Sequence, residues 1–377
     1  MLSYDAGPTD RPILHETVGA NFERTVARYP DAVALVDLAQ RLRYTYAELN
    51  DEIDAVARGL LARGVGKGDR VGLWAPNCAQ WVVAQFAVAK VGAILVNINP
   101  AYRLHELSYV LQQSGTSVLI CATAFKSSDY AAMVTRVRPQ LPELREVIFL
   151  DGPDWQQLYV AGESVHSDVL VARQVALSDI DPVNIQYTSG TTGFPKGATL
   201  SHRNIVNNGF FVTEGIRLTA GESLCVPVPF YHCFGMVMGT LGCTTHGAAV
   251  VIPGPGFDPE ATLAAVESEK CAGIYGVPTM FIAMQNHPSF ARRDLSSLRT
   301  GVMAGSVCPV EVMKRVCDRD EHVRGGYRLR DDRDLAGVLS DPDRRRSGAA
   351  HRHHRTRPPA CGDQNSRSGR RCHRAAR

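Results

Sequence analysis

One segment of the chain gathers the side chains that a phosphate-binding loop needs. Residues 187–202 read Tyr-Thr-Ser-Gly-Thr-Thr-Gly-Phe-Pro-Lys-Gly-Ala-Thr-Leu-Ser-His. Glycine lets the backbone bend and approach a ligand closely, and the lysine ammonium is a mobile point charge. Backbone N–H groups, hydroxyls and one cation can together surround a polyphosphate. The predicted phosphate ligands are Thr188, Ser189, Gly190, Thr191, Thr192, Gly193 and Lys196.

This loop differs from a Walker A loop, in which glycine directly precedes the lysine and serine or threonine follows it. Here Pro195 precedes Lys196 and Gly197 follows it. From composition alone, the same cluster also fits a flexible turn between a strand and a helix that begins near Ser201. The residues by themselves leave both interpretations open.

The full string Tyr-Thr-Ser-Gly-Thr-Thr-Gly-x-Pro-Lys-Gly resembles the signature of the adenylate-forming enzymes: acyl-CoA synthetases, luciferases and the adenylation domains of peptide synthetases. The resemblance covers about residues 15–318, and the sequences of these motifs are most similar to those of medium-chain fatty acyl-CoA synthetases. Further blocks resemble the family in family order. They are Tyr44–Leu49, Gly68–Val71, Pro76–Asn77, Gly92–Ile94, Pro229–Gly235, Tyr275–Thr279 and Ala304–Pro309.

The resemblance implies a two-step reaction and its small-molecule partners. A carboxylate attacks the α-phosphorus of ATP with the help of Mg²⁺, which gives acyl-AMP and pyrophosphate. The thiolate of coenzyme A then displaces AMP. Because negative charge is redistributed on phosphates, positioned donors and a metal ion suit this chemistry. Lys196 and Thr188 are the expected catalytic residues, and no metal ligand is assigned.

The resemblance places the acyl and adenine sides of the site in three later segments. His232 stands between aromatic residues just before Gly235, and from composition alone it also fits a packed core histidine. Val277 to Thr279 also fit a plain strand-end turn. Small residues after Met303 permit the close approach of a flat ring. The expected substrate residues are His232, Gly235, Val277, Pro278, Thr279, Met303 and Ala304, and Gly305 and Ser306 are expected on the nucleotide.

The order of elements predicts the α/β class, with stacked and mostly parallel sheets flanked by helices. Predicted strands include 32–38, 70–74, 93–98, 117–121, 146–150 and 183–187, with helices between them. A capping-box pattern, Thr45 with Glu48, predicts a helix that runs to about Arg63. The segment 151–181 is more polar and less periodic, so we expect a surface connection there. His202 is expected to begin a helix.

Composition argues against several other classes of protein. From residue 318 onward there are 16 arginines, no lysine and 9 acidic residues, which leaves 25 basic and 29 acidic residues before it. The earlier part therefore has a net charge of −4, and the positive total is no sign of nucleic-acid binding. Cys225, Cys233 and Cys243 lack metal spacing and are expected to be buried free thiols. No apolar run is long enough to span a membrane, and we expect a cytoplasmic enzyme.

After Asp318 the sequence changes character. No Val, Ile, Leu, Met, Phe, Tyr or Trp occurs from Ser340 to Arg377, so this part cannot build a core. Back-translated and read one base later, residues 329–338 can encode Tyr-Gly-Met-Thr-Glu-Thr-Ser-Pro-Val, which contains the Tyr-Gly-x-Thr-Glu motif expected in the family. We therefore expect an incomplete large domain over 10–318, an out-of-frame and disordered segment over 319–377, and a missing C-terminal small domain.

Two other classes of function fit parts of the sequence. One is a non-catalytic ATP- or acyl-binding protein that keeps only the loop. The other is a binder of nucleic acid through the arginine-rich tail, and the histidines at 351, 353 and 354 also fit a metal-binding tract. Within the acyl-CoA synthetases, the apolar residues around His232, Val277 and Met303 favour a fatty acid of medium or longer chain as the substrate over an amino acid.

Overall fold

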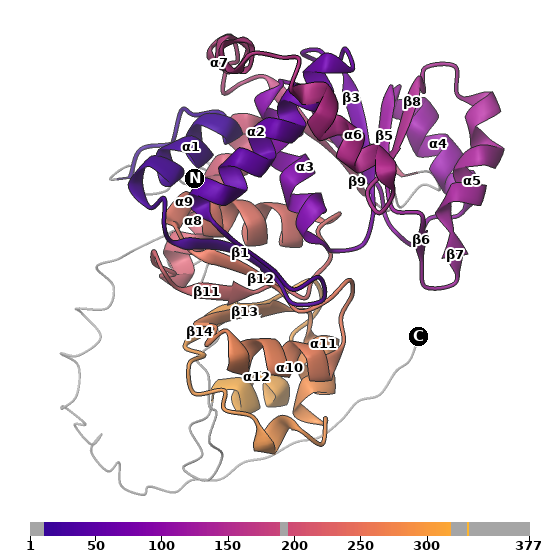
Figure 1. Ribbon diagram of the computed structural model, residues 1–377. Coiled ribbons are helices and arrows are strands. Elements are labelled where there is room, and N and C mark those ends of the chain that lie inside the picture. Colours follow the sequence, from indigo (N-terminus) through magenta and orange to yellow (C-terminus); the bar gives the residue numbers. More distant parts are fainter. Residues whose placement is uncertain (1–10, 189–194, 318–329, 332–377) are drawn as a thin grey trace, which may run out of the picture.

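Two β-sheets with helices on their faces make up the part of the chain that the structure describes (Figure 1). This computed structural model describes residues 11–188, 195–317 and 330–331. The predicted α/β class with mostly parallel strands is confirmed. The expectations for residues 189–194, and those for 319–377 apart from residues 330–331, lie outside the described residues.

The six-stranded sheet carries the start of the predicted phosphate loop. Its strand order is β10-β9-β4-β3-β5-β8, and every neighbouring pair is parallel except β9 with β10. β4 and β5 are buried along their whole length, as expected for parallel strands covered on both faces. The bounds are β3 Arg70–Trp74, β4 Ile94–Asn97, β5 Val118–Cys121, β8 Glu146–Phe149, β9 Pro182–Thr188 and β10 Lys196–Ser201.

The seven-stranded sheet has the order β15-β14-β13-β11-β12-β1-β2. Its strands are parallel except for β2, which pairs antiparallel with β1 at one edge. The bounds are β1 Val33–Asp37, β2 Leu42–Thr45, β11 Ser223–Cys225, β12 Ala249–Ile252, β13 Gly273–Gly276, β14 Thr300–Met303 and β15 Arg330–Asp331. A separate two-stranded ribbon joins β6 (Ala124–Phe125) to β7 (Ser128–Asp129).

Helix α3 (Ala79–Lys90) lies between the two sheets and touches β1 as well as β3 and β4. All of its residues except Gln80 are buried. A helix that is covered on all sides needs no polar face, which explains why its apolar residues follow no one-sided pattern. At its last position the ammonium of Lys90 is wholly buried and bonds to Glu23, Asn50 and Asp54.

Helices cover the outer faces of both sheets (Figure 1). On the seven-stranded sheet, α10, α11 and α12 share an apolar core with its strands, and Phe281 and Leu298 are among its buried residues. The other helices belong with the larger core between and around the sheets. The bounds are α1 Val18–Arg28, α2 Tyr46–Ala62, α4 Leu104–Ser114, α5 Tyr130–Val137, α6 Pro153–Gly162, α7 Ser167–Val175, α8 His202–Ile216, α9 Gly242–His246, α10 Pro259–Ser268, α11 Pro278–Gln285 and α12 Val310–Cys317, with 3₁₀ turns at Arg138–Gln140 and Phe290–Arg292 and a π-helix, η2, at Phe234–Leu241.

Two local expectations have different outcomes. The predicted capping box is present, because Thr45 and Glu48 bond reciprocally at the start of α2. The expectation of a surface connection over 151–181 is wrong, because this segment forms α6 and α7. Trp155 and Leu158 are buried there, and packing on these few apolar residues offsets the weak periodicity of the sequence.

Two further expectations concern the burial of the cysteines and the absence of a membrane-spanning segment. The seven cysteines whose side chains the structure describes are all free thiols. Cys225 and Cys243 are buried as predicted, but Cys233 is exposed, which corrects that part of the prediction. Within the described ranges, the helices are too short or too polar to cross a membrane.

Candidate functional site

The predicted phosphate loop joins two antiparallel strands, β9 and β10, which form what we call the phosphate hairpin. Thr188 ends β9 and pairs directly with Lys196, the first residue of β10. The Thr188 hydroxyl donates to the Lys196 carbonyl over 3.5 Å, and both residues are exposed. Lys196 therefore presents its ammonium at the exposed edge of the sheet, directly after the loop.

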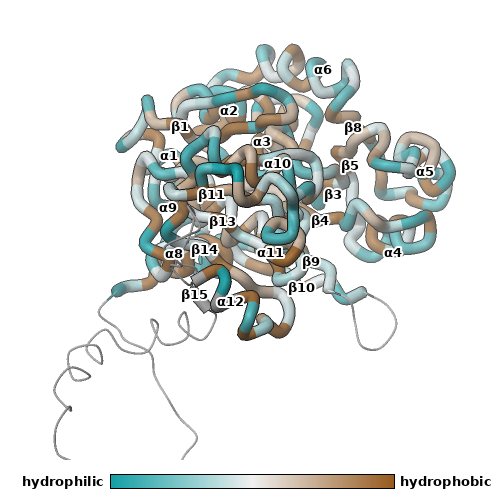
Figure 2. Tube along the Cα trace, turned by 90° about the horizontal axis from the view of Figure 1, so that it is seen from below, coloured by the Kyte–Doolittle hydropathy of each residue, from teal (hydrophilic) through white to brown (hydrophobic). Residues whose placement is uncertain are grey.

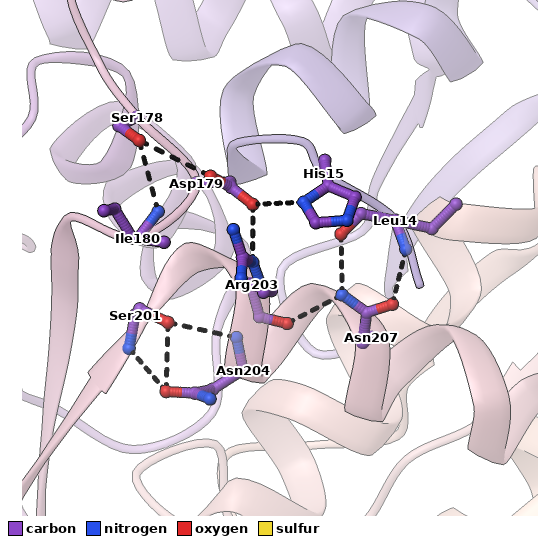
Figure 3. Close-up of polar contacts among 9 residues, drawn as sticks. All are labelled: Leu14, His15, Ser178, Asp179, Ile180, Ser201, Arg203, Asn204 and Asn207. Atoms are coloured by element: carbon purple, nitrogen blue, oxygen red, sulfur yellow. Dashed lines mark hydrogen bonds and ion pairs between the residues drawn. The ribbon is translucent and has the colours of Figure 1, made fainter. Parts of the chain in front are cut away.

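The base of the phosphate hairpin is tied to the rest of the domain where β10 runs into α8. Ser201 and Asn204 form a reciprocal cap at the start of this helix, and Asp179 binds both Arg203 and His15 (Figure 3). His202, expected to begin the helix, is buried, and its Nδ1 accepts the Val18 N–H at 3.0 Å. Burial lowers the pKa of His202 to about 4, so the ring is neutral at pH 7.

A second contact holds the far end of the hairpin. The Tyr109 hydroxyl, on α4, donates to the carbonyl of Pro195 over 3.2 Å. Figure 2 shows α4 near the β9–β10 edge of the sheet. The ring of Tyr187 packs against β10, since a Cβ added to Gly197 would lie 3.3 Å from the Tyr187 Cζ. The residue just before Lys196 is thus fixed from a helix outside the sheet.

The predicted acyl-side residues follow β11 in a segment that we call the acyl-side segment, residues 226–235. His232 is exposed rather than packed in the core, so the alternative of a core histidine is wrong. Its Nδ1 accepts the N–H of Phe234 at 3.1 Å, and partial desolvation lowers its pKa. The neutral ring can therefore offer a hydrogen bond at this surface near pH 7.

Gly235 is buried where the acyl-side segment turns into the π-helix η2. A Cβ at this position would lie only 2.4 Å from the carbonyl oxygen of Pro229. No side chain fits at that distance, so glycine is required by close backbone approach. π-Helical turns are rare and are frequently found at functional sites, and this one begins at Phe234.

The third predicted group lies at the carboxyl ends of β13 and β14, which pair in parallel. The Ala304 N–H donates to the Gly276 carbonyl over 3.2 Å. Gly305 has a φ of +92°, and a Cβ there would lie 3.1 Å from Val277. Pro278 is buried at the first turn of α11, and Thr279 and Ser306 are exposed.

One predicted substrate residue points elsewhere. Successive side chains of a strand alternate between faces, and Val302 belongs to the core between the sheets while Met303 belongs to the core under α10–α12. The Met303 side chain therefore lies on the face away from Tyr275, and only its backbone remains at the strand end. Tyr275 itself packs on Phe234, with ring centroids 5.3 Å apart.

Buried asparagines join these groups and were missed from the sequence. Asn97, at the end of β4, donates to the carbonyl of Tyr231 over 2.9 Å. Asn77 binds Val228 and Phe230 of the same segment. Asn97 is a polar residue at the end of a buried strand, and Asn77 belongs to the Pro76–Asn77 block that resembles the family, so these two signals could have marked them. Within the described ranges, no group of three or more His, Cys, Asp or Glu residues could hold a metal ion.

Comparison with known proteins identifies the family of this chain. The AMP-binding enzyme family matches residues 22–328. The mitochondrial medium-chain acyl-CoA ligase ACSF2 of Danio rerio is 43% identical over 334 residues, which are 83% of this chain and 55% of the relative. Human ACSF2 is 40% identical over 341 residues, 84% of this chain and 55% of the relative. The chain belongs to the AMP-binding enzyme family.

Solved structures agree with this assignment. The inhibitor-bound N-terminal domain of FACL13 from Mycobacterium tuberculosis superposes with a TM-score of 0.71 at 26% identity, over 79% of this chain and 72% of that one. The long-chain-fatty-acid-CoA ligase FadD1 of Archaeoglobus fulgidus shares the fold, with a TM-score of 0.75 at 20% identity, over 88% of this chain and 66% of that one. The chain spans little more than half the length of the curated relatives, 55% of the zebrafish protein.

Proposed function

We propose that this chain is the front part of an ATP-dependent fatty acid–CoA ligase that forms an acyl-adenylate. The observation that carries the proposal is the phosphate hairpin, which holds Thr188 and Lys196 side by side where two strands flank the signature loop. The names of the 40–43% identical relatives, medium-chain acyl-CoA ligases, support the same reaction. ATP, Mg²⁺ and coenzyme A are the expected small-molecule partners.

In this proposal the residues of the chain bind and orient the reactants. The exposed ammonium of Lys196 attracts the phosphates of ATP, and Thr188 with the loop residues 189–193 donates hydrogen bonds. Ala304, Gly305 and Ser306 leave room for the adenine ring because their side chains are small. Mg²⁺ supplies neutralising charge on the phosphates when it is bound, and no described residue is assigned to it.

The acyl side favours a fatty acid over an amino acid. None of residues 229–235, 275–279 or 303–308 is acidic, so no carboxylate of these segments can pair with an α-ammonium group. His232 stays neutral near pH 7 because its pKa is lowered, and it can hydrogen-bond the substrate carboxylate without holding it as an ion pair. Phe234 follows it in the chain and packs on Tyr275, which brings apolar side chains to this part of the site.

The decisive experiment measures adenylate formation directly. The gene is tested as it stands and with one base removed after codon 318, and carboxylate-dependent exchange of pyrophosphate into ATP is followed. We expect exchange with octanoate-like acids in the repaired protein, and about a hundredfold loss in Lys196→Ala, which removes a positioned charge. Preference for amino acids in a carboxylate panel would contradict the fatty acid, and unchanged exchange in Lys196→Ala would remove Lys196 from the mechanism.

A second candidate function is binding of ATP or acyl groups without turnover. The arginine-rich segment after Asp318, in which the Tyr-Gly-x-Thr-Glu motif is absent in this reading frame, favours it. We expect this chain to make no measurable acyl-CoA, because the proposed frame shift after Asp318 removes the Tyr-Gly-x-Thr-Glu motif from its sequence. A stable 377-residue monomer that produces acyl-CoA would contradict both this expectation and the frame shift.

A further inference from the structure

Three buried amide side chains join the phosphate side of the site to the acyl side. Asn77, Asn97 and Asn184 have 5%, 2% and 1% of their surface exposed, and all come from the six-stranded sheet or the turn after β3. Burying an amide is costly unless it is hydrogen-bonded. Every polar side-chain atom of the three except Asn184 Oδ1 has a hydrogen-bond partner. Most of the partners lie in the acyl-side segment and the π-helix that follow β11 of the other sheet.

Asn97 is the centre of the group, and its partners fix which way its amide points. Its Nδ2 donates to the Tyr231 carbonyl at 2.9 Å and lies 3.3 Å from the sulfur of Met236. Its Oδ1 accepts from Asn184 Nδ2 at 2.9 Å, and the same nitrogen also donates to the Leu95 carbonyl at 2.8 Å. One side chain thus binds the acyl-side segment and β9 at once.

Within the phosphate hairpin, strand β9 connects Asn184 to Thr188, the residue before the loop. Residues 184, 186 and 188 share one face of the strand because side chains alternate. Gln186 Nε2 lies 3.9 Å from the sulfur of Met236, so this face looks towards the start of the π-helix. Thr188, four residues beyond Asn184, is the last described residue before the loop.

Asn77 holds the acyl-side segment from the turn that follows β3. Its Nδ2 donates to the Val228 carbonyl at 2.9 Å, and its Oδ1 accepts the Phe230 N–H at 2.8 Å. Gln85 of α3 adds a contact further along, since its Nε2 lies 3.4 Å from the Met236 carbonyl. Backbone groups from Val228 to Met236 are therefore bonded to amides whose positions the six-stranded sheet and α3 determine.

We propose that Asn77 and Asn97 are positioning residues that set the register between the acyl-side segment and the phosphate hairpin. Neither touches a reacting atom. Their role is to keep the carboxylate and the α-phosphorus at a fixed separation, which is what a reaction between two bound groups requires. The inference rests on the proposed function, because it assigns the two segments to the two halves of an acyl-adenylate.

The test compares a linked ligand with one of its halves. AMP and a non-hydrolysable octanoyl-sulfamoyl adenosine are titrated into the 377-residue chain by calorimetry. A linked ligand gains from a fixed distance between its two subsites, and a half ligand does not. We expect Asn97→Ala and Asn77→Ala to bind the linked ligand about tenfold more weakly, while AMP affinity changes by less than about twofold.

Asn207→Ala is the matched control. Asn207 is also a buried asparagine that bonds a distant backbone in both directions, to the N–H and the carbonyl of Leu14, at 2.8 and 2.9 Å (Figure 3). It lies on α8, and the partners of its side chain, Leu14 and the Arg203 carbonyl, are outside the acyl-side segment. We expect it to lower the melting temperature as the other variants do, without changing the ratio of the two affinities.

The outcomes separate the two proposals. If neither the unmodified chain nor the frame-repaired protein binds either ligand, the proposed function fails and this inference fails with it; where only the repaired protein binds, the same variants are compared in that protein. If AMP binds normally and the affinity ratio is the same in Asn97→Ala, Asn77→Ala and Asn207→Ala, only the positioning role is overturned. Hydrogen exchange is a second readout for a variant too unstable to titrate: faster exchange of the Phe230 amide in Asn77→Ser supports the role, and unchanged exchange contradicts it.

Discussion

The phosphate hairpin and the acyl-side segment lie at the two sides of one candidate site, yet they are built in opposite ways. From Lys196 to Thr199 the residues of β10 are exposed, and this strand is the free edge of the six-stranded sheet. The acyl-side segment instead has Val226, Val228 and Phe230 buried and its backbone held by two buried asparagines.

The difference follows from the ligands that the two regions are proposed to bind. A polyphosphate is strongly hydrated, so groups that meet it work best from an exposed position where they can adjust. An alkyl chain offers no directional contacts, so its position depends on a surface that is already in place. The four predictions below test this contrast between an adaptable edge and a fixed segment.

The largest effect on ligand binding is expected from the single charge at the exposed edge. Lys196→Ala should weaken ATP binding by about tenfold or more, because a charge-assisted contact to the phosphates is lost. AMP, which lacks the two outer phosphates, should bind nearly as before. Calorimetric titration of both nucleotides measures this split, and Lys270→Ala, which removes an exposed lysine paired with Asp294, is the control. Equal losses of affinity for ATP and AMP would show that Lys196 does not contact the two outer phosphates of ATP.

A methyl group should be far more harmful in the fixed segment than at the edge. In Gly235→Ala the new Cβ meets a backbone carbonyl at 2.4 Å, and we expect the free energy of unfolding to fall by about 2–3 kcal/mol. In Gly197→Ala the nearest atom is the Ile185 Cγ2 at 3.0 Å, a side-chain atom that can move, and less than about 1 kcal/mol should be lost. Urea denaturation measures the free energy of unfolding of both variants. Similar losses in the two would contradict the expected difference between the acyl-side segment and the exposed edge.

The base of the hairpin should respond to acid through His202. Its folded-state pKa is lowered to about 4 by burial, against the opposing effect of Asp181 and Asp179 and with a smaller lowering from Lys67. The unfolded chain, with an ordinary pKa of about 6.5, binds the proton first as pH falls. Stability that is present above pH 6.5 is therefore lost between about pH 6.5 and 4, by up to about 3 kcal/mol.

A variant isolates this contribution from that of His246, whose pKa is also lowered to about 4 by burial. His202→Asn keeps an acceptor for the Val18 N–H and cannot titrate. Urea midpoints measured from pH 7 to pH 4 should fall less steeply in this variant than in the unmodified protein. Parallel curves would show that His202 is already charged in the folded state or does not differ from the unfolded chain.

The smallest effect is expected from the outer contact of the hairpin. Tyr109→Phe removes one hydroxyl, and with it the bond to the Pro195 carbonyl. We expect ATP affinity to fall about threefold or less, the size of one net hydrogen bond. Tyr130→Phe is matched, because the Tyr130 hydroxyl, on α5, also donates to a proline carbonyl, that of Pro100 and not one of the hairpin. An equal change in ATP affinity in both variants would show that the Tyr109–Pro195 hydrogen bond makes no specific contribution to ATP binding.

Local signals in the sequence predicted most elements of the fold. The capping box of Thr45 and Glu48, the glycine turn before Arg70 and the apolar strands each depend on neighbours within a few residues. The helices α6 and α7 were missed because they are held by a few buried residues rather than by a periodic face. The antiparallel partner of β9 was also missed, since β10 is an exposed edge strand with little apolar pattern.

What the sequence determined by itself is the chemistry available: a run of hydroxyls and glycines ending in Lys196, a histidine before a glycine, and small residues after Met303. Side-chain type and order are local properties that do not depend on the fold. Only the tertiary structure decided which of these groups share a face. It turned the Met303 side chain away, exposed His232 and joined Asn97 to Tyr231, which is 134 residues away in the chain, because packing between two sheets follows distances in space and not along the sequence.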